Sequence, residues 1–318
     1  MNIVDNVFPF LKHFRGLLHL NKFYPIVFAG LFFHSSVLAD YLEITLLGTG
    51  TPRPSIERFG SATLIQADGK YFLFDAGRGA TIRLQQAGIT PNQIHQVFLT
   101  HLHSDHISGL DDLWITGWIY QRDGDLVVYG PKGTQHTIDA MRSMYREDIG
   151  YRTTNVNHKE AFLKSIEVSP GVVYDDNRVK ISTFAVNHAP VEPALAYRLD
   201  FGDRSVVISG DTTLSDTLIQ QAKNVDVLIH EITDASPKLV ARNPRLSKIM
   251  AYHTTPQQLT QVLTQTQPRL AVMNHVLLFG VGEDSVLKKI RQDYTGRVEF
   301  GYDLMRLQVG TNINILTP

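Results

Sequence analysis

The sequence predicts an α/β protein in which two β-sheets pack face to face and helices cover their outer faces. Clusters of strand-like runs are followed by strand–helix pairs, and this order recurs in both halves of the chain. It departs from the strict strand–helix alternation of one parallel sheet and suits two stacked sheets. No short-period repeat, low-complexity tract or linker rich in Pro and Ser interrupts it. We therefore predict one domain over residues 40–318.

In the first half of this domain, short runs bounded by Gly, Asp or Pro have the composition of strands. The expected strands are Tyr41–Leu47, Ala62–Gln66, Tyr71–Phe74, Gln96–Leu99 and Leu126–Tyr129. Amphipathic stretches between them predict helices at Thr81–Gln86, Leu110–Tyr120 and Thr137–Tyr145. The first of these helices is followed by Gly88, a residue typical of a helix end.

The second half repeats this arrangement. Its expected strands are Val179–Ala185, Ala194–Phe201, Ser205–Ser209, Val225–Ile229, Leu270–Met273 and Val298–Phe300. Its expected helices are Ser215–Lys223, Pro256–Thr264 and Ser285–Gln292. Two stretches, Arg146–Lys159 and Thr233–His253, are predicted to be long loops, and loops of that length are often functional.

The composition excludes several classes of chemistry. The chain of 318 residues contains no Cys, which rules out a disulfide scaffold, a thiolate zinc site, a Cys nucleophile and a lipidated Cys. A transition metal must therefore bind to His and carboxylates. The formal net charge of −1 gives no overall basic field to attract nucleic acid. With 43% hydrophobic and 19% charged residues, the composition is that of an ordinary folded protein.

The N-terminal segment has the features of a secretory signal peptide. Lys12, Arg15 and Lys22 precede an apolar run, Phe23–Phe33, which is too short to span a membrane. A Val-Leu-Ala sequence ends at Ala39, which indicates a cleavage site. We expect residues 1–39 to be a signal peptide and the mature protein to be periplasmic or secreted, without a membrane anchor. An uncleaved anchor or a buried helix is the alternative.

Four potential metal ligands lie within the segment His101–His106. His101 and His103 are two residues apart on an extended segment, so their side chains share one face and can bind one metal ion. Asp105 and His106 follow at the start of a helix and can point to a second. Ligands so crowded need a cation to hold them together. The segment therefore predicts a metal site.

Further ligands are expected at the ends of other strands. His188, Asp211 and His275 each follow a predicted strand, and the carboxyl ends of strands are where such folds build sites. Taken singly, each is more commonly a turn or capping residue. Their significance comes from completing the ligand set that begins with His101.

These residues resemble the motifs of the metallo-β-lactamase-fold hydrolases, over nearly the whole chain from Tyr41 onward. The matching segments are LLGTGTP (Leu46–Pro52), FDAG (Phe74–Gly77), HLHSDH (His101–His106), His188, SGDT (Ser209–Thr212) and His275. The resemblance implies an αββα sandwich of two mixed β-sheets with outer helices and a site at the sheet edges.

The resemblance also implies two Zn²⁺ ions per chain, which together activate a water molecule. The implied ligands are His101, His103 and His188 for the first ion, Asp105, His106 and His275 for the second, and Asp211 as a bridge. Asp75 is implied to orient the ligand loop, and Asp105 also to relay a proton from the nucleophile.

Within this family the chain looks most like the ribonuclease Z branch. HEIT at His230–Thr233 and HTT at His253–Thr255 are similar to two elements of that branch. They imply that His253 donates a proton to the leaving group and that Glu231 holds it. A carboxylate that binds one imidazole nitrogen leaves the other available as a general acid. The alternatives are a surface turn charge for Glu231 and a residue at the start of a helix for His253.

One departure argues against processing of tRNA. The branch carries a long arm that grips tRNA between His188 and Ser209, but here this stretch reads as a plain hairpin. The chain is also similar to exported, arm-less arylsulfatase-like zinc hydrolases. We therefore expect an exported binuclear zinc hydrolase of a small-molecule anionic ester, an aryl or alkyl sulfate.

Other functions remain open at this point. The alternatives are a phosphodiesterase acting on a cyclic nucleotide or in the manner of ribonuclease Z, and a lactonase or β-lactamase. A non-catalytic metal-binding protein is disfavoured by the complete ligand set. The predicted loop Thr233–His253 carries basic residues that either cover the ester or are solvated: Lys238, Arg242, Arg245 and Lys248. Substrate-binding residues are not assigned, and a homodimer stays open.

Overall fold

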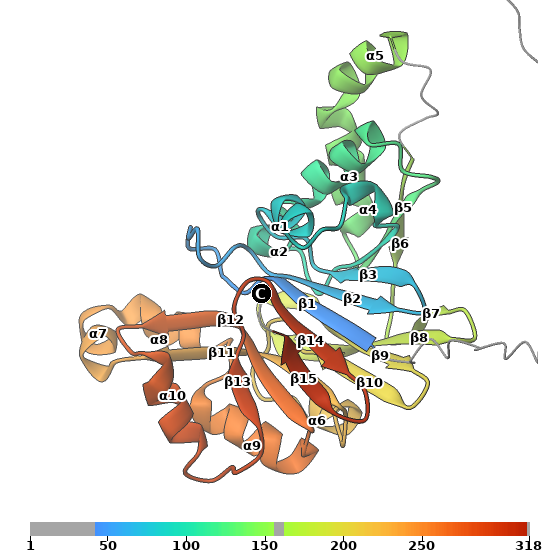
Figure 1. The fold of residues 1–318 in the computed structure, drawn as a ribbon. Coiled ribbons are helices and arrows are strands. Elements are labelled where there is room, and N and C mark those ends of the chain that lie inside the picture. The colour runs from blue at the N-terminus through green and yellow to red at the C-terminus, as the bar shows by residue number, and fades with distance from the viewer. Residues whose placement is uncertain (1–41, 156–161, 317–318) are drawn as a thin grey trace, which may run out of the picture. The chain divides into compact units, whose positions relative to one another are not determined.

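Two mixed β-sheets lie face to face as the inner layers of the structure (Figure 1). The first has the spatial order β15 (Ile313–Leu316), β14 (Met305–Val309), β1 (Leu42–Gly48), β2 (Ala62–Ala67), β3 (Lys70–Phe74), β4 (Gln96–Phe98), β5 (Leu126–Gly130) and β6 (Leu163–Glu167). The second has the order β13 (Val298–Phe300), β12 (Leu270–Phe279), β11 (Val227–Ala235), β10 (Arg204–Ile208), β9 (Val191–Phe201), β8 (Val179–His188) and β7 (Gly171–Asp175). Each sheet combines parallel and antiparallel pairs.

This computed structural model describes residues 42–155 and 162–316, all within one unit that spans Ala39–Pro318. The predicted signal peptide, residues 1–39, lies outside the described residues and stays a prediction. So do residues 156–161 of the first predicted loop. No helix of the described part is long and apolar enough to cross a membrane.

Helices cover the outer face of each sheet, as the strand–helix order predicts. The first sheet packs against α1 (Ala80–Gln86), α3 (Leu110–Ile119) and α4 (Thr134–Met144). The second packs against α6 (Asp216–Gln221), α9 (Pro256–Thr266) and α10 (Glu283–Ile290). The architecture is therefore the expected αββα sandwich.

The core between the sheets follows from the alternation of side chains along each strand. In β1, Leu42, Ile44 and Leu46 face the second sheet, whereas Leu47 packs against the helices. Aromatic rings fill the centre: Phe98 stacks on Phe74 with a centroid distance of 5.1 Å. Tyr197 of β9 donates a hydrogen bond of 2.8 Å to the Leu99 carbonyl oxygen, just beyond β4. This hydrogen bond connects the second sheet to the segment that leads to His101.

The structure corrects both loop predictions. Most of the first expected loop forms α5 (Arg146–Asn155), and the second contains the end of β11, α7 (Pro237–Arg242) and α8 (Pro244–Met250). Helix α5 lacks an apolar stripe and carries an Arg152–Asp148 ion pair of 2.8 Å one turn apart. The side chains of Ser236 and Asn243 accept backbone hydrogen bonds at the starts of α7 and α8, each followed by Pro.

Several elements were not expected from the sequence. The short 3₁₀ helix η1 (Pro91–Gln93) and the strands β6, β7, β14 and β15 were missed. Of these strands, β6, β7 and β15 lie at sheet edges, where exposure on both faces weakens the hydrophobic alternation. β11 and β12 also run several residues beyond their predicted ends, because they continue to pair with each other.

Candidate metal centre

The histidine-rich segment lies at the carboxyl end of two parallel strands. β3 and β4 pair in parallel, and beyond them the Asp75 N–H donates to the Phe98 carbonyl oxygen at 2.9 Å. The chain then stays extended through His103 and begins the short helix α2 (Ser104–Ile107). Because of this change of conformation, His101 and His103 point to one cluster of ligands and the residues of α2, Asp105 and His106, point to another, as predicted.

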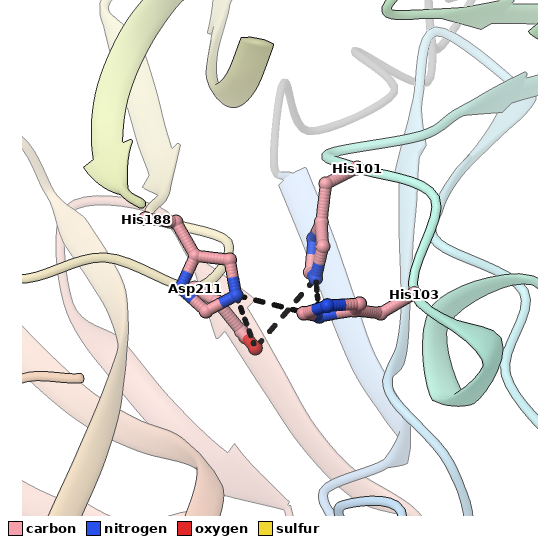
Figure 2. Close-up of side chains that lie close together, drawn as sticks. All are labelled: His101, His103, His188 and Asp211. Carbon is pink, nitrogen blue, oxygen red and sulfur yellow. Dashed lines mark hydrogen bonds and ion pairs between the residues drawn. The ribbon is translucent and has the colours of Figure 1, made fainter. Parts of the chain in front are cut away.

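The first cluster joins both sheets. Figure 2 shows His101 and His103 facing His188 and Asp211, with ring nitrogens and a carboxylate oxygen converging. The His101 Nε2 and His103 Nδ1 atoms are 2.9 Å apart, and His188 Nε2 is 3.4 Å from the same His103 nitrogen. Asp211 Oδ2 lies 3.7 Å from Nε2 of both His101 and His188. These four side chains can hold a metal ion.

The second cluster lies directly beside the first and consists of Asp105, His106 and His275. His275 Nε2 is 3.0 Å from Asp105 Oδ2. Asp211 reaches this group as well, because its Oδ1 is 3.3 Å from His106 Nε2 and 3.4 Å from His275 Nδ1. The two oxygens of Asp211 thus face different clusters, which is the geometry of a bridging carboxylate.

A β-bulge places His275. Glu231 pairs with Asn274 and Ile232 with Val276, so His275 is the extra residue of β12. Its backbone has a φ of 44°, in the left-handed region. The Val276 N–H leaves the ladder and donates to the Thr49 carbonyl oxygen at 3.2 Å. The bulge turns the His275 side chain toward Asp105 and Asp211.

Asp75 supports both clusters from behind. Its Oδ2 accepts from His106 Nδ1 at 2.7 Å, and its Oδ1 accepts from the Thr100 N–H at 2.8 Å. The Thr100 hydroxyl lies 3.0 Å from His101 Nδ1. His188 Nδ1 is likewise held, 2.9 Å from the Tyr252 carbonyl oxygen. Fixing one ring nitrogen in this way orients the other nitrogen toward a metal.

The donor set fits divalent metal ions. In the described part of the chain, the ion-pair partners of Asp105 and Asp211 are all histidines. His106 Nε2, Asp211 Oδ1 and His275 Nδ1 are buried without a hydrogen-bond partner. Burial lowers the pKa of His188 to about 4 and also lowers the pKa of His101. Buried imidazoles and carboxylates that converge in this way are typical ligands of zinc and similar ions.

His253 and Glu231 form a buried pair next to the second cluster. His253 Nδ1 is 2.9 Å from Glu231 Oε1, which also accepts from the Thr212 N–H at 2.8 Å. Glu231 is 1% exposed, so it is not a surface turn charge. Burial alone would lower the pKa of His253, but the Glu231 carboxylate outweighs it and raises this pKa. The pair therefore favours a protonated imidazole.

A cavity of about 310 Å³ opens above the clusters. Its floor includes His103, Asp105, Asp211, His253 and His275. Its walls consist of Thr51, Pro52, Arg53, Arg245, Ile249, Tyr252 and Val276–Phe279. Of the four basic residues predicted to cover a substrate, Arg245 lines this cavity, whereas Lys238, Arg242 and Lys248 are not among its lining residues. No spacing in the sequence identified the other wall residues.

The fold and this site define a metal-dependent hydrolase of the metallo-β-lactamase fold. The chain belongs to the family whose model is described as anti-Pycsar protein Apyc1, which matches residues 42–275. Ribonuclease Z of Mycobacterium sp. (strain KMS) is 34% identical over 274 residues, which cover 84% of this chain and 96% of that protein. Ribonuclease Z of Mycobacterium marinum is also 34% identical, over 84% of this chain and 99% of its own length.

Solved structures share the fold at lower identity. The metallo-β-lactamase-fold protein YhfI from Bacillus subtilis has a TM-score of 0.66 and 19% identity, and the match covers 85% of this chain and all of that one (100%). The short form of human tRNase Z has a TM-score of 0.62 and 21% identity, with 83% and 98% covered. The comparisons confirm the ribonuclease Z-like resemblance. They do not show the expected closeness to arylsulfatases.

Proposed function

We propose that this protein is a zinc-dependent phosphodiesterase. The observation that carries the proposal is the His253–Glu231 pair, of which His253 lines the cavity beside the metal clusters, in a chain 34% identical to proteins named ribonuclease Z. A phosphodiester has an alkoxide leaving group that needs a proton, whereas hydrolysis of a carbonyl compound has less need of one. An alkyl sulfate has the same leaving group, so the preference for a phosphodiester over a sulfate ester rests on the relatives named ribonuclease Z.

The proposed ligands are those that the sequence predicts. His101, His103 and His188 would hold one zinc ion, Asp105, His106 and His275 would hold another, and the carboxylate of Asp211 faces both clusters. When bound, the two ions supply an activated water at neutral pH and stabilise negative charge on the attacked group. Asp105 lines the cavity floor and accepts a proton from the attacking water.

His253 acts on the leaving group, whereas Asp105 acts on the attacking water. Glu231 fixes its Nδ1, so Nε2 is the nitrogen that donates to the leaving alkoxide. The buried carboxylate also raises the pKa of His253, which favours the protonated ring that a general acid needs. The rings of His188 and His275 lie 5.1 and 5.6 Å from that of His253, which limits its rotation.

The size of the substrate needs a direct test. In the described structure, β8, β9 and β10 form plain hairpins with no arm between His188 and Ser209. However, the mycobacterial relatives match over 96% and 99% of their own length, so this feature does not separate the chain from proteins named ribonuclease Z. A small diester is proposed because the cavity is small.

The first experiment compares ester classes on the zinc-loaded full chain. We expect turnover of bis(4-nitrophenyl) phosphate and little of 4-nitrophenyl sulfate, because the relatives 34% identical to this chain are named ribonuclease Z. A lactone and a β-lactam serve as carbonyl substrates. Turnover of the sulfate with none of the phosphodiester would contradict the proposal and restore the sulfatase hypothesis.

The second experiment removes the proton donor. His253→Ala is expected to slow an alkyl phosphodiester about 10²–10⁴-fold, and a 4-nitrophenyl diester far less, because nitrophenolate leaves without protonation. Glu231→Gln should show a weaker version of this pattern, with unchanged zinc content. His136→Ala, which removes an exposed histidine of α4, is the matched control. Equal losses on both substrates would show that His253 binds metal or substrate instead.

A further inference from the structure

A second, smaller cavity lies between the apolar core and the metal centre. Its lining includes Phe74 and Ile229 from the core as well as Asp211 and His275 from the clusters. We call it the inner cavity; its volume is about 10 Å³, and nearly all of its lining residues are buried. A space of that size holds a single water molecule, which needs roughly 10–15 Å³ and two to four polar partners.

Two residues that line the inner cavity each have an oxygen atom without a partner. Glu231 Oε2 and Asn274 Oδ1 are buried without a hydrogen bond, in residues that are 1% and 5% exposed. Glu231 accepts from the Thr212 N–H and from His253 only through its other oxygen, Oε1. Buried acceptors are costly when they receive no hydrogen bond, so both atoms need a donor.

The register of β11 and β12 explains why these two side chains face the same cavity. Glu231 and Asn274 are direct neighbours across the parallel ladder and form the last regular pair before the bulge at His275. Two residues earlier in each strand, Ile229 and Val272 belong to the core between the sheets. Because side chains alternate along a strand, Glu231 and Asn274 also point inward.

The protein groups around these oxygens do not provide the missing donor. The Ser209 hydroxyl also lines the inner cavity, but it donates to the Gly210 carbonyl oxygen at 2.6 Å and accepts from the Glu231 N–H at 3.1 Å. The Glu231 carboxylate and the Asn274 carbonyl oxygen are both acceptors and cannot bond to each other. A small molecule with two donor hydrogens, such as water, satisfies both of them.

The first sheet supplies possible donors to that molecule. Thr63 of β2 and Ser61, just before this strand, are buried and line the inner cavity with their hydroxyl-bearing side chains. A buried water typically makes about three hydrogen bonds, so it can donate twice and accept from one of these hydroxyls. It would then connect the two sheets beside the metal centre.

From these observations we infer that the inner cavity binds one water molecule, which donates to Glu231 Oε2 and Asn274 Oδ1. Asn274 is thereby a positioning residue for His253: Oε1 of Glu231 holds the His253 ring, and the water prevents the carboxylate from turning away. The role toward His253 rests on the proposed phosphodiesterase function, whereas the water site does not.

A crystal structure of the zinc-loaded full chain at atomic resolution tests the water site without any variant. We expect one ordered water within hydrogen-bond distance of both Glu231 Oε2 and Asn274 Oδ1. A direct contact between the two side chains, with no water between them, would overturn the inference. In Asn274→Leu, which keeps a similar shape but removes the acceptor, the same water should be lost.

Kinetics of Asn274→Leu test the positioning role. The variant should lower kcat for an alkyl phosphodiester roughly tenfold, because Glu231 loses one charge-assisted hydrogen bond that keeps it in place. This loss is smaller than the about 10²–10⁴-fold expected for His253→Ala. A 4-nitrophenyl diester should be affected far less, since its leaving group needs no proton. KM and zinc content should not change.

Asn187→Leu is the matched control. Asn187 directly precedes the ligand His188, as Asn274 precedes His275, but its side chain is exposed and donates to the Leu214 carbonyl oxygen at 2.9 Å. It should leave kcat for both diesters unchanged. Equal losses in the two variants would overturn the positioning role. Equal losses on the two diesters in Asn274→Leu, or a loss of zinc, would overturn it as well.

The two experiments separate this inference from the proposed function. An ordered water at the predicted place in a protein that hydrolyses no phosphodiester would uphold the water site and refute the proposed reaction. Phosphodiester hydrolysis that depends on His253, in a protein whose inner cavity holds no ordered water, would refute the inference and leave the phosphodiesterase intact.

Discussion

Asp75 connects the two metal clusters through its hydrogen bonds. It binds His106 directly and reaches His101 through Thr100. Asp75→Asn should therefore lower zinc affinity by about 10–100-fold, the effect typical of losing a group that orients metal ligands. Competition with a chromogenic zinc chelator measures this affinity.

Asp226→Asn is the control for that measurement. Asp226 is also a buried carboxylate, and it accepts from the Ser205 N–H at 2.8 Å, but it is not among the residues of either cluster. We expect it to change stability without changing zinc affinity. An equal loss of zinc in both variants would mean that Asp75 acts only through the fold.

At the scale of single residues, the sequence predicted most members of the metal centre. The metal-ligand candidates occur in short motifs, and the structure brings all of them together with Asp75, Glu231 and His253. It did not predict Tyr252 or Phe279 as cavity residues. Phe279 lines the cavity because β12 continues beyond His275, and Tyr252 does so because α8 ends at Met250. No local sequence pattern encodes either of these limits.

Among the elements, the segment Thr49–Phe59 is held at both ends by one carboxylate, that of Asp303. Asp303 accepts from two backbone N–H groups and from Arg83 Nε, and its side chain is 3% exposed. Asp303→Ala should destabilise the protein by about 1–3 kcal/mol, because these donors lose their acceptor. Hydrogen exchange of residues 49–59, followed by mass spectrometry, should accelerate more than exchange in the central strands.

Asp203→Ala changes a carboxylate whose side chain is 79% exposed, in the β9–β10 turn, and should leave that exchange unaltered. If residues 49–59 exchange at the original rate in Asp303→Ala, other contacts hold the segment.

The elements that sequence patterns missed are those whose stability comes from distant partners or from charge. β11 and β12 extend past Glu231 and Asn274 because each pairs with the other, although two polar residues interrupt the apolar run of each strand there. α5 carries Glu147 and Asp148 in its first turn and has no apolar stripe. Hydrophobic periodicity detects neither effect.

For the whole molecule, metal binding should add substantially to stability. Buried imidazoles and carboxylates from both sheets meet at the centre, and a ligand that binds only the folded chain stabilises it by about 2.7 kcal/mol at 100 times its Kd. We expect two equivalents of zinc by metal analysis and a fall in Tm after chelation. A single equivalent, or a Tm that ignores the chelator, would contradict a binuclear centre.

The layered architecture itself was predictable, because it depends on the order of strand and helix patterns rather than on their exact limits. The predicted strand run that ends at Ile229 is apolar on both faces, with Val227 and Ile229 between the sheets and Leu228 against the helices, as a strand between two covered surfaces requires. The pairing partners were not predictable, since the C-terminal hairpin gave no signal that it returns to β1.

That return has a consequence for synthesis on the ribosome. β1 lies between β2 and β14, with Leu42 opposite Val309, so the first strand to be made receives its second neighbour almost last. A nascent chain that has just passed His275 already contains every proposed ligand, yet one edge of β1 is still open. Exposed edges recruit other chains. Release of the final hairpin from the exit tunnel is thus the step that closes the first sheet and ends this exposure to misassembly.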